Sequence, residues 1–129
     1  MEACPSYRMK ILALINLDYN FSAMLTKVCD SSNSELVFLD NALEVGAYSN
    51  HNNVLIILDV NEWKKQLEDV INECREHSSF PIIGLLDKMD LKLKRKSNSI
   101  GLTALLTKSM FIYNIKTIEK QILNASSNT

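Results

Sequence analysis

Short apolar runs without alternation are the feature that most constrains this chain. Met9–Ile15 (MKILALI) and Val54–Leu58 (VLIIL) contain almost no polar residues. A strand with one face in water alternates apolar and polar residues, so an unbroken run predicts a strand covered on both faces, as in a parallel sheet. Three weaker runs of the same type are Glu35–Leu39, Pro81–Leu86 and Thr103–Thr107. The sequence therefore predicts five buried parallel strands.

Helical periods separate these runs. Apolar residues recur every three or four positions within residues 21–28, 62–77 and 115–122, which predicts three amphipathic helices. Asp18 is placed to cap the first of them. Residues 41–49 and 88–100 are too irregular to assign. Strands that alternate with helices predict an α/β fold, a parallel sheet with helices on both faces and right-handed crossovers.

Length and charge limit the function classes. With 129 residues the chain has room for one ordinary domain, which we place at residues 9–123 between a tail at 1–8 and a tail or linker start at 124–129. Its apolar runs are far shorter than the roughly 20 residues of a membrane span, and no signal peptide is evident, which predicts a cytoplasmic protein without membrane contact. A formal charge of -1 gives no overall attraction to nucleic acid.

Several common ligand sites lack their motifs. Cys4, Cys29 and Cys74 have no CxxC spacing, which predicts free thiols and neither a disulfide framework nor a zinc site. GLLDKMDL, at residues 84–91, resembles the guanine-recognition motif of small GTPases, but Asp87 replaces its asparagine and the chain has no glycine-rich phosphate loop. The turn after the first strand has no glycine, which argues against FMN. No nucleotide or flavin cofactor is expected.

One carboxylate is placed where parallel sheets collect their functional groups. Asp59 ends the Val54–Leu58 run, and Lys108 ends the last predicted strand. Ligands and catalytic groups of open α/β sheets lie at the carboxyl ends of the strands, so Asp59 and Lys108 are expected to lie near each other. Asp59 could equally be a helix cap or a turn residue, since acidic residues are common at such boundaries.

The order and spacing of these segments resemble the receiver domain of two-component response regulators. The segments that carry the resemblance, over nearly the whole chain, are MKILALIN, NVLIILD, PIIGLL and GLTALLTKS. The resemblance implies a flavodoxin-like (CheY-like) sheet of five strands in the order 2-1-3-4-5. It also implies that Asp59 stands at the phosphoacceptor position and Lys108 at the position of the lysine that contacts the phosphoryl group.

Several positions depart from the family's pattern. The two acidic residues that normally hold magnesium are replaced by Ile15 and Asn16, so Asn16 and Asp59 are at most weak metal candidates, with Asp18 as partial compensation. We therefore expect no cofactor, and magnesium binding that is weak at best. The switch hydroxyl and the switch aromatic are replaced by Leu86 and Leu105, which cannot report a phosphate by hydrogen bonding.

The loop after Asp59 departs as well, because Trp63 stands where the family often has proline and the usual glycine-containing loop is absent. We expect the following helix to start early, with Asp59 or Asn61 as its cap, and the Trp63 indole to lie near the rim of the pocket.

These departures predict an atypical receiver, or pseudo-receiver, that signals by binding a protein partner or a second copy, largely without phosphorylation. It is not expected to be an enzyme beyond self-phosphotransfer onto Asp59. In the family, partners commonly dock on the fourth helix, fifth strand and fifth helix, a region that here carries the basic residues Lys92, Lys94, Arg95 and Lys96. A DNA-binding output domain could lie outside this chain. The alternative is a receiver phosphorylated on Asp59 with weakened magnesium dependence.

Overall fold

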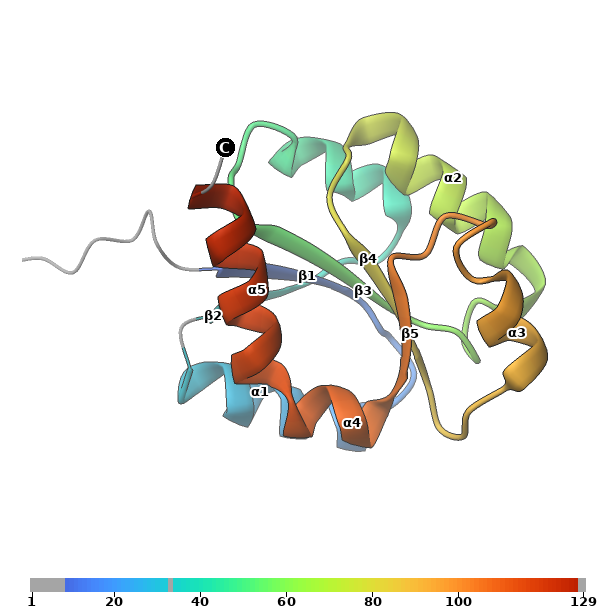
Figure 1. The fold of residues 1–129 in the computed structure, drawn as a ribbon, viewed down its shortest axis with the longest axis horizontal. Coiled ribbons are helices and arrows are strands. Elements are labelled where there is room, and N and C mark those ends of the chain that lie inside the picture. The colour runs from blue at the N-terminus through green and yellow to red at the C-terminus, as the bar shows by residue number, and fades with distance from the viewer. Residues whose placement is uncertain (1–8, 33, 128–129) are drawn as a thin grey trace, which may run out of the picture.

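The computed structural model describes residues 9–32 and 34–127, so the tail proposed at residues 1–8 lies outside the described part (Figure 1). The strands are β1 (Met9–Leu14), β2 (Ser34–Phe38), β3 (Val54–Asp59), β4 (Ile82–Leu86) and β5 (Ala104–Thr107). The α-helices are α1 (Tyr19–Asp30), α2 (Leu67–His77), α3 (Leu91–Lys96), α4 (Lys108–Tyr113) and α5 (Ile115–Ser127), and two 3-10 helices are η2 (Ala42–Tyr48) and η3 (Lys64–Gln66).

The five strands form one sheet in the order β2-β1-β3-β4-β5. All four neighbouring pairs are parallel, and the register pairs Leu14 with Leu58 and Asp59 with Leu85. The predicted α/β fold, its strand order and its five strands are therefore confirmed. Every residue of β3 and β4 is buried, which explains why their sequences do not alternate.

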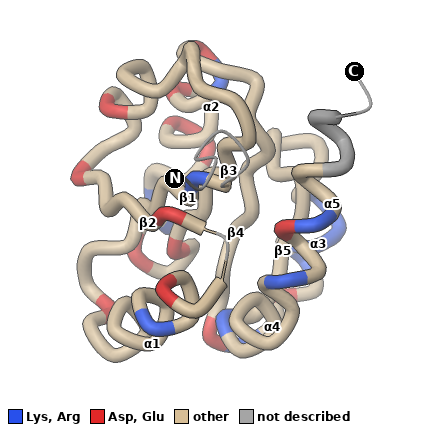
Figure 2. The backbone as a smooth tube through the Cα atoms, turned by 90° about the vertical axis from the view of Figure 1, so that its left-hand side faces the viewer, with Lys and Arg blue, Asp and Glu red and all other residues tan. Residues whose placement is uncertain are grey.

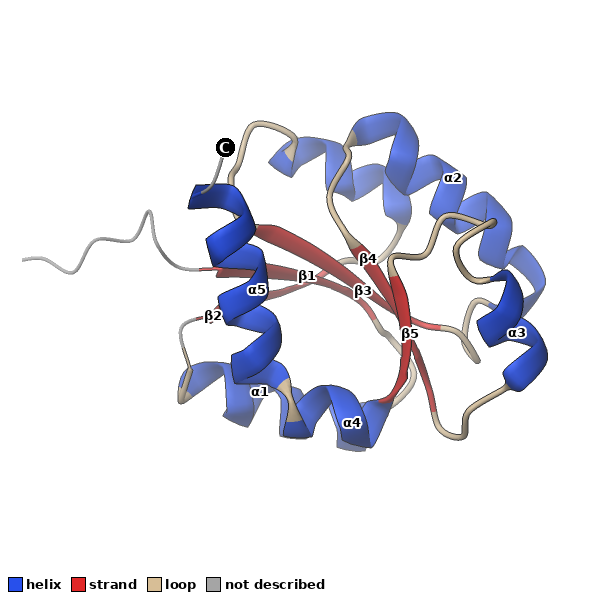
Figure 3. Cartoon of the chain, viewed as in Figure 1, coloured by secondary structure: helices blue, strands red, loops and turns tan. Residues whose placement is uncertain are grey.

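Helices cover both faces of the sheet (Figure 3). Alternate residues of a strand point to opposite faces, so Met9 and Ile11 join the core under α1, α4 and α5, while Leu12 and Leu14 join the core under η2, α2 and α3. Phe111 fills the first core and Ile71 the second, and both are fully buried. The sheet thus lies between two apolar layers of side chains, each covered by helices.

The first helix follows its sequence signal. Asp18 caps α1, and its side chain accepts a hydrogen bond from the backbone N–H of Phe21. Phe21 and Leu25 are buried as predicted, whereas Met24 is 50% exposed. The buried apolar stripe of α1 is therefore narrower than the sequence pattern predicts.

The predicted early start of the third helical segment is wrong. The regular helix α2 begins at Leu67, after the short turn η3, and its N-cap is Gln66. Asp59 instead accepts a hydrogen bond from the backbone N–H of Asn61, a local turn that needs no helix. Neither Asp59 nor Asn61 is therefore the helix cap.

The two unassigned segments both contain short helices. Residues 41–49 contain η2, and residues 88–100 contain α3, whose N-cap Asp90 accepts a hydrogen bond from the backbone N–H of Leu93. The last helical segment is broken at Asn114 into α4 and α5, and α5 runs to Ser127, past the boundary placed at residue 123. No described helix is long and apolar enough to span a membrane.

Candidate functional site

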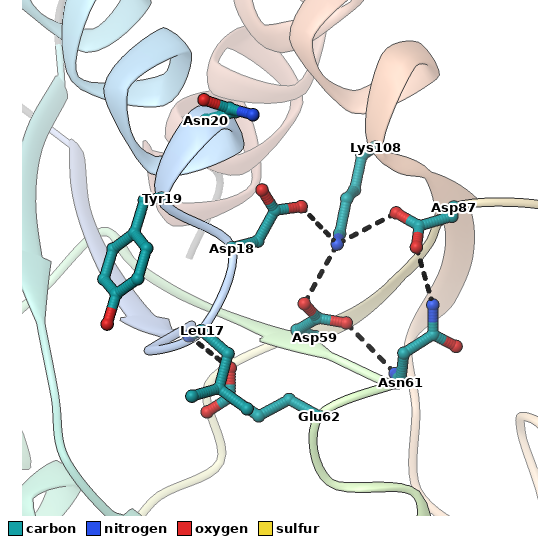
Figure 4. Close-up of a pocket in the computed structure, with 9 residues that line it drawn as sticks. All are labelled: Leu17, Asp18, Tyr19, Asn20, Asp59, Asn61, Glu62, Asp87 and Lys108. Carbon is teal, nitrogen blue, oxygen red and sulfur yellow. Dashed lines mark hydrogen bonds and ion pairs between the residues drawn. The ribbon is translucent and has the colours of Figure 1, made fainter.

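Four elements bring charged side chains together at the carboxyl-terminal edge of the sheet (Figure 4). Asp59 ends β3, Asp87 follows β4, Lys108 follows β5, and Asp18 precedes α1. They line a cavity of about 500 Å³. Strands of a parallel sheet end on the same edge, which is why residues far apart in the sequence meet here.

Lys108 is the centre of this cluster. Its Nζ lies 2.7 Å from Asp18 Oδ2, 2.9 Å from Asp59 Oδ2 and 3.0 Å from Asp87 Oδ1. The residue is only 8% exposed, and its ammonium also lies 5.7 Å from the ring centroid of Phe21. The Lys108 ammonium therefore links α4, on which Lys108 lies, to the start of α1, the end of β3 and the loop after β4. Its three N–H donors are matched by three carboxylates.

The carboxylate of Asp59 is also held by hydrogen bonds within the chain. Asp59 is 3% exposed, so an unpaired carboxylate here would destabilise the fold. Oδ1 accepts a hydrogen bond of 3.0 Å from the backbone N–H of Asn61, and Oδ2 accepts one of 2.9 Å from Lys108. Both carboxylate oxygens of Asp59 thus accept hydrogen bonds from within the chain.

Asp18 has two functions. Oδ1 caps α1 at the backbone N–H of Phe21, and Oδ2 pairs with Lys108. The hydrogen bond from Lys108, followed by that from Phe21, lowers the pKa of Asp18 below its ordinary value. A carboxylate whose pKa is lowered by folding stabilises the folded state above its unfolded pKa, and this contribution is lost as the pH falls through the folded pKa.

The pKa of Lys108 is shifted in the opposite direction. Burial by itself would lower it, but the hydrogen bonds to Asp18, Asp59 and Asp87 outweigh burial and raise the pKa above its ordinary value. A lysine of this kind stabilises the fold fully below its unfolded pKa, and the contribution is lost as the pH rises through the folded pKa. Between these two limits Asp18 and Lys108 both stay charged and paired.

A fourth carboxylate of the cavity, that of Glu62, holds the loop that follows β1. Glu62 Oε1 accepts hydrogen bonds from the backbone N–H groups of Asn16 and Leu17, at 2.7 and 3.0 Å. The side-chain amide of Asn16 donates to Leu39 O and Glu62 Oε2, both at 3.3 Å. Asn16 therefore points its donors at neighbouring oxygens.

Trp63 contacts the end of β1 and the apolar core, and it does not line the cavity. Its Nε1–H donates a hydrogen bond of 2.9 Å to the backbone carbonyl of Leu14, and its ring packs against the core on the α2 side of the sheet. The cavity is lined by Glu62 and Asn61, and Trp63 is not among its lining residues. The expectation of an indole at the pocket rim is therefore wrong.

The remaining positions at which the sequence departs from the receiver pattern are apolar core. Ile15, Leu86 and Leu105 are 2%, 3% and 2% exposed. Ile15 packs on the α1 side of the sheet, whereas Leu86 and Leu105 pack on the α2 side. Within residues 9–32 and 34–127, no group of three His, Cys, Asp or Glu side chains is arranged to hold a metal ion.

The four basic residues of the predicted interaction region all lie on α3 and are exposed. Lys92 and Lys96 are one helical turn apart and line a groove that faces the start of α2, whereas Lys94 and Arg95 do not line it. The structure therefore divides this basic cluster between two sides of a short helix. Acidic and basic positions are otherwise interspersed over the chain (Figure 2).

Two members of the site are not predicted from the sequence. Asp87 stands in a motif that resembles the guanine-recognition motif, yet it directly follows β4, so the rule that points to Asp59 applies to it equally. Glu62 has no such signal, because its contact with Asn16 joins positions 46 apart in the chain. No local pattern marks such a contact.

Solved structures of other proteins resemble this chain in their fold. No family model matches the chain, and no curated protein matches it. Among solved structures, a response regulator from Thermotoga maritima has a TM-score of 0.70 at 15% identity, covering 91% of this chain and 98% of that one. The phosphorylated cyanobacterial phytochrome response regulator RcpA has a TM-score of 0.68 at 19% identity, covering 92% and 96%.

A third similar structure is the pilus assembly protein CpaE from Caulobacter crescentus, with a TM-score of 0.62 at 17% identity, covering 86% of this chain and 93% of that one. At these identities the likeness concerns the fold. The strand order agrees with it. The chain has the fold of the response regulator receiver domains.

Proposed function

We propose that this chain is an atypical receiver module that acts by binding another protein or a second copy, without a magnesium-dependent phosphorylation cycle. The observation that carries the proposal is the ammonium of Lys108, which is paired with Asp18, Asp59 and Asp87 at 2.7 to 3.0 Å. This internal cation already pairs with the carboxylates that a metal ion would need.

The set of donor atoms supports the same conclusion. Magnesium prefers an octahedral shell of oxygens. Ile15 supplies no side-chain oxygen, Asn16 donates its amide N–H groups to Glu62 and Leu39, and Glu62 is held by backbone N–H groups. These residues do not fit a magnesium site.

A binding role is supported on the face that the family commonly uses, here α3, β5 and the α4–α5 segment. A groove of about 350 Å³ lies over β5 and α5 and is lined by apolar side chains that include Ala104, Leu106, Ile118 and Ile122. Exposed apolar grooves of this kind are typical of protein contact sites. We propose this face for a protein partner or a homodimer.

The test is exposure to a small phosphodonor. The protein is incubated with acetyl phosphate and magnesium and its intact mass is measured, beside Asp59→Asn and Asp87→Asn, the latter an exposed carboxylate of the same pocket. We expect no phosphoryl adduct that depends on Asp59, because both of its oxygens are engaged and buried. An adduct present in the wild type and in Asp87→Asn but absent from Asp59→Asn would overturn the proposal.

A second function is favoured by one observation, the 2.9 Å contact between Lys108 Nζ and Asp59 Oδ2 beside an open cavity. In this alternative Asp59 Oδ2 attacks the phosphorus of the donor, the bond to the donor's leaving oxygen breaks, and an acyl phosphate forms on Asp59. Lys108 would stabilise the charge on the transferred group. The same mass measurement separates the two functions.

A further inference from the structure

A second groove, which shares only Asn61 with the lining of the Asp59 cavity, runs between the start of α2 and the helix α3. Its volume is about 680 Å³, and it is lined by residues of η3, the first turn of α2, the loop after β4 and α3. These segments lie side by side in Figure 1. No residue of the Asp18, Asp59, Asp87 and Lys108 cluster lines it.

Lysines form both walls of this groove. Lys64 and Lys65 come from η3, and Lys88, Lys92 and Lys96 come from the loop after β4 and from α3. Within the part of the chain that the structure describes, none of these ammonium groups forms an ion pair. These five lysines outnumber the three carboxylates that also line the groove, Glu68, Asp69 and Asp90, so the groove has a net positive charge in a protein whose formal charge is -1.

The floor of the groove is apolar. Val60, Leu67, Leu86 and Leu93 line it, and each is less than a tenth exposed. Leu86 is the residue that stands at the position of the family's switch hydroxyl. An apolar floor between cationic walls is complementary to a segment that carries carboxylates beside one or two apolar side chains.

We propose that this groove binds an acidic, partly apolar peptide segment of a partner protein. A nucleic acid fits less well, for two reasons. Glu68, Asp69 and Asp90 also line the groove and would repel a continuous phosphate backbone, whereas a peptide can place its acidic residues opposite the lysines alone. No aromatic side chain lines the groove on which a base could stack.

The inference rests on the proposed function in one respect, that the domain acts by binding proteins, and it adds the chemistry of the partner. It does not depend on the state of Asp59, which lies outside the groove. The two proposals fail separately, because phosphorylation of Asp59 would contradict the proposed function and leave peptide binding untouched.

The experiment is a fluorescence anisotropy titration of the full chain with a labelled peptide of about ten residues composed of Asp, Glu, Leu and Ser. The comparison probes are the same peptide with Lys in place of each acidic residue and a single-stranded thymidine oligonucleotide of similar length. We expect the acidic peptide alone to bind, with an affinity that falls as salt is raised.

Matched charge reversals locate the binding surface. Lys92→Glu/Lys96→Glu changes the groove wall, and Lys94→Glu/Arg95→Glu makes the same change of charge on the same helix outside the groove. We expect the first pair to weaken binding by about tenfold and the second to have little effect. Lys64→Glu/Lys65→Glu changes the opposite wall of the groove and is expected to weaken peptide binding to a similar extent. Such a result could not come from a folding defect confined to α3.

Three results would overturn the inference. They are the absence of binding by the acidic peptide, equal weakening by the Lys92/Lys96 and Lys94/Arg95 pairs, and tighter binding of the oligonucleotide. Loss of binding in both groove pairs, with the Lys94/Arg95 pair unchanged, supports it. Circular dichroism melting of each variant shows whether the fold is intact.

Discussion

Replacement of Lys108 by methionine is expected to lower the free energy of unfolding by about 3 kcal/mol. Methionine keeps most of the length and the apolar stem but removes the ammonium. Asp59, whose side chain is 5% exposed, would then be a buried carboxylate without a cation. The value lies at the low end for a broken buried pair because Asp18 and Asp87, at 30% and 65% exposure, can be hydrated.

Urea denaturation of the variant beside wild type measures this change. Lys92→Met, the same substitution at an exposed position without an ion pair, is the control and is expected to stay within about 0.5 kcal/mol of wild type. Adding Asp59→Asn to Lys108→Met should recover part of the loss, because the unpaired charge is then removed. If Lys108→Met matched the Lys92→Met control, the ammonium would not stabilise the cluster.

Gly101→Ala is expected to destabilise the fold by a similar amount, about 3 kcal/mol. Gly101 has a φ of +106°, a conformation that residues with a Cβ rarely adopt. An added Cβ would also lie 2.7 Å from Cγ2 of Ile71, a fully buried residue of α2. Backbone strain and overlap with a packed side chain therefore act together just before β5.

Gly46→Ala is the matched control. Gly46 lies in η2, its φ is not positive, and an added Cβ would meet the His77 ring at 3.2 Å. His77 is only partly buried and can move, so the cost should be below about 1 kcal/mol. Thermal and urea unfolding of both variants measure the difference. A Gly101→Ala variant as stable as Gly46→Ala would contradict the expected strain at Gly101.

Much of the fold could be predicted from local pattern. The unbroken apolar runs of β1 and β3 are buried on both faces, and the strand order follows the receiver resemblance. The start of α2 could not be predicted, because Trp63 contributes to an apolar stripe of helical period and yet donates its indole N–H to Leu14 O. A tertiary hydrogen bond there outweighs helical periodicity.

The candidate site was predictable only where strand ends define it. Asp59 and Lys108 were placed together because each ends a strand, and the structure puts them 2.9 Å apart. The sequence offers Asp18 only as a helix cap and as partial compensation for the missing metal ligands, whereas the turn into α1 brings it 2.7 Å from Lys108. Loop conformation decides such positions, and it depends on contacts across the chain such as that of Glu62 with Asn16.

Lys108, and not a metal ion, is the cation that pairs with the carboxylates at this edge of the sheet. The most direct test is a magnesium titration followed by the fluorescence of Trp63, the one tryptophan of the chain, with sodium chloride at matched ionic strength as the control. Trp63 and its neighbour Glu62 hold the end of β1 and the loop after it, so a metal bound there would disturb the indole.

We expect no change in emission beyond the sodium chloride control up to about 10 mM magnesium, because the carboxylates remain paired with Lys108. A saturable change below about 1 mM magnesium, present in the wild type and lost in Asp59→Asn, would contradict the account.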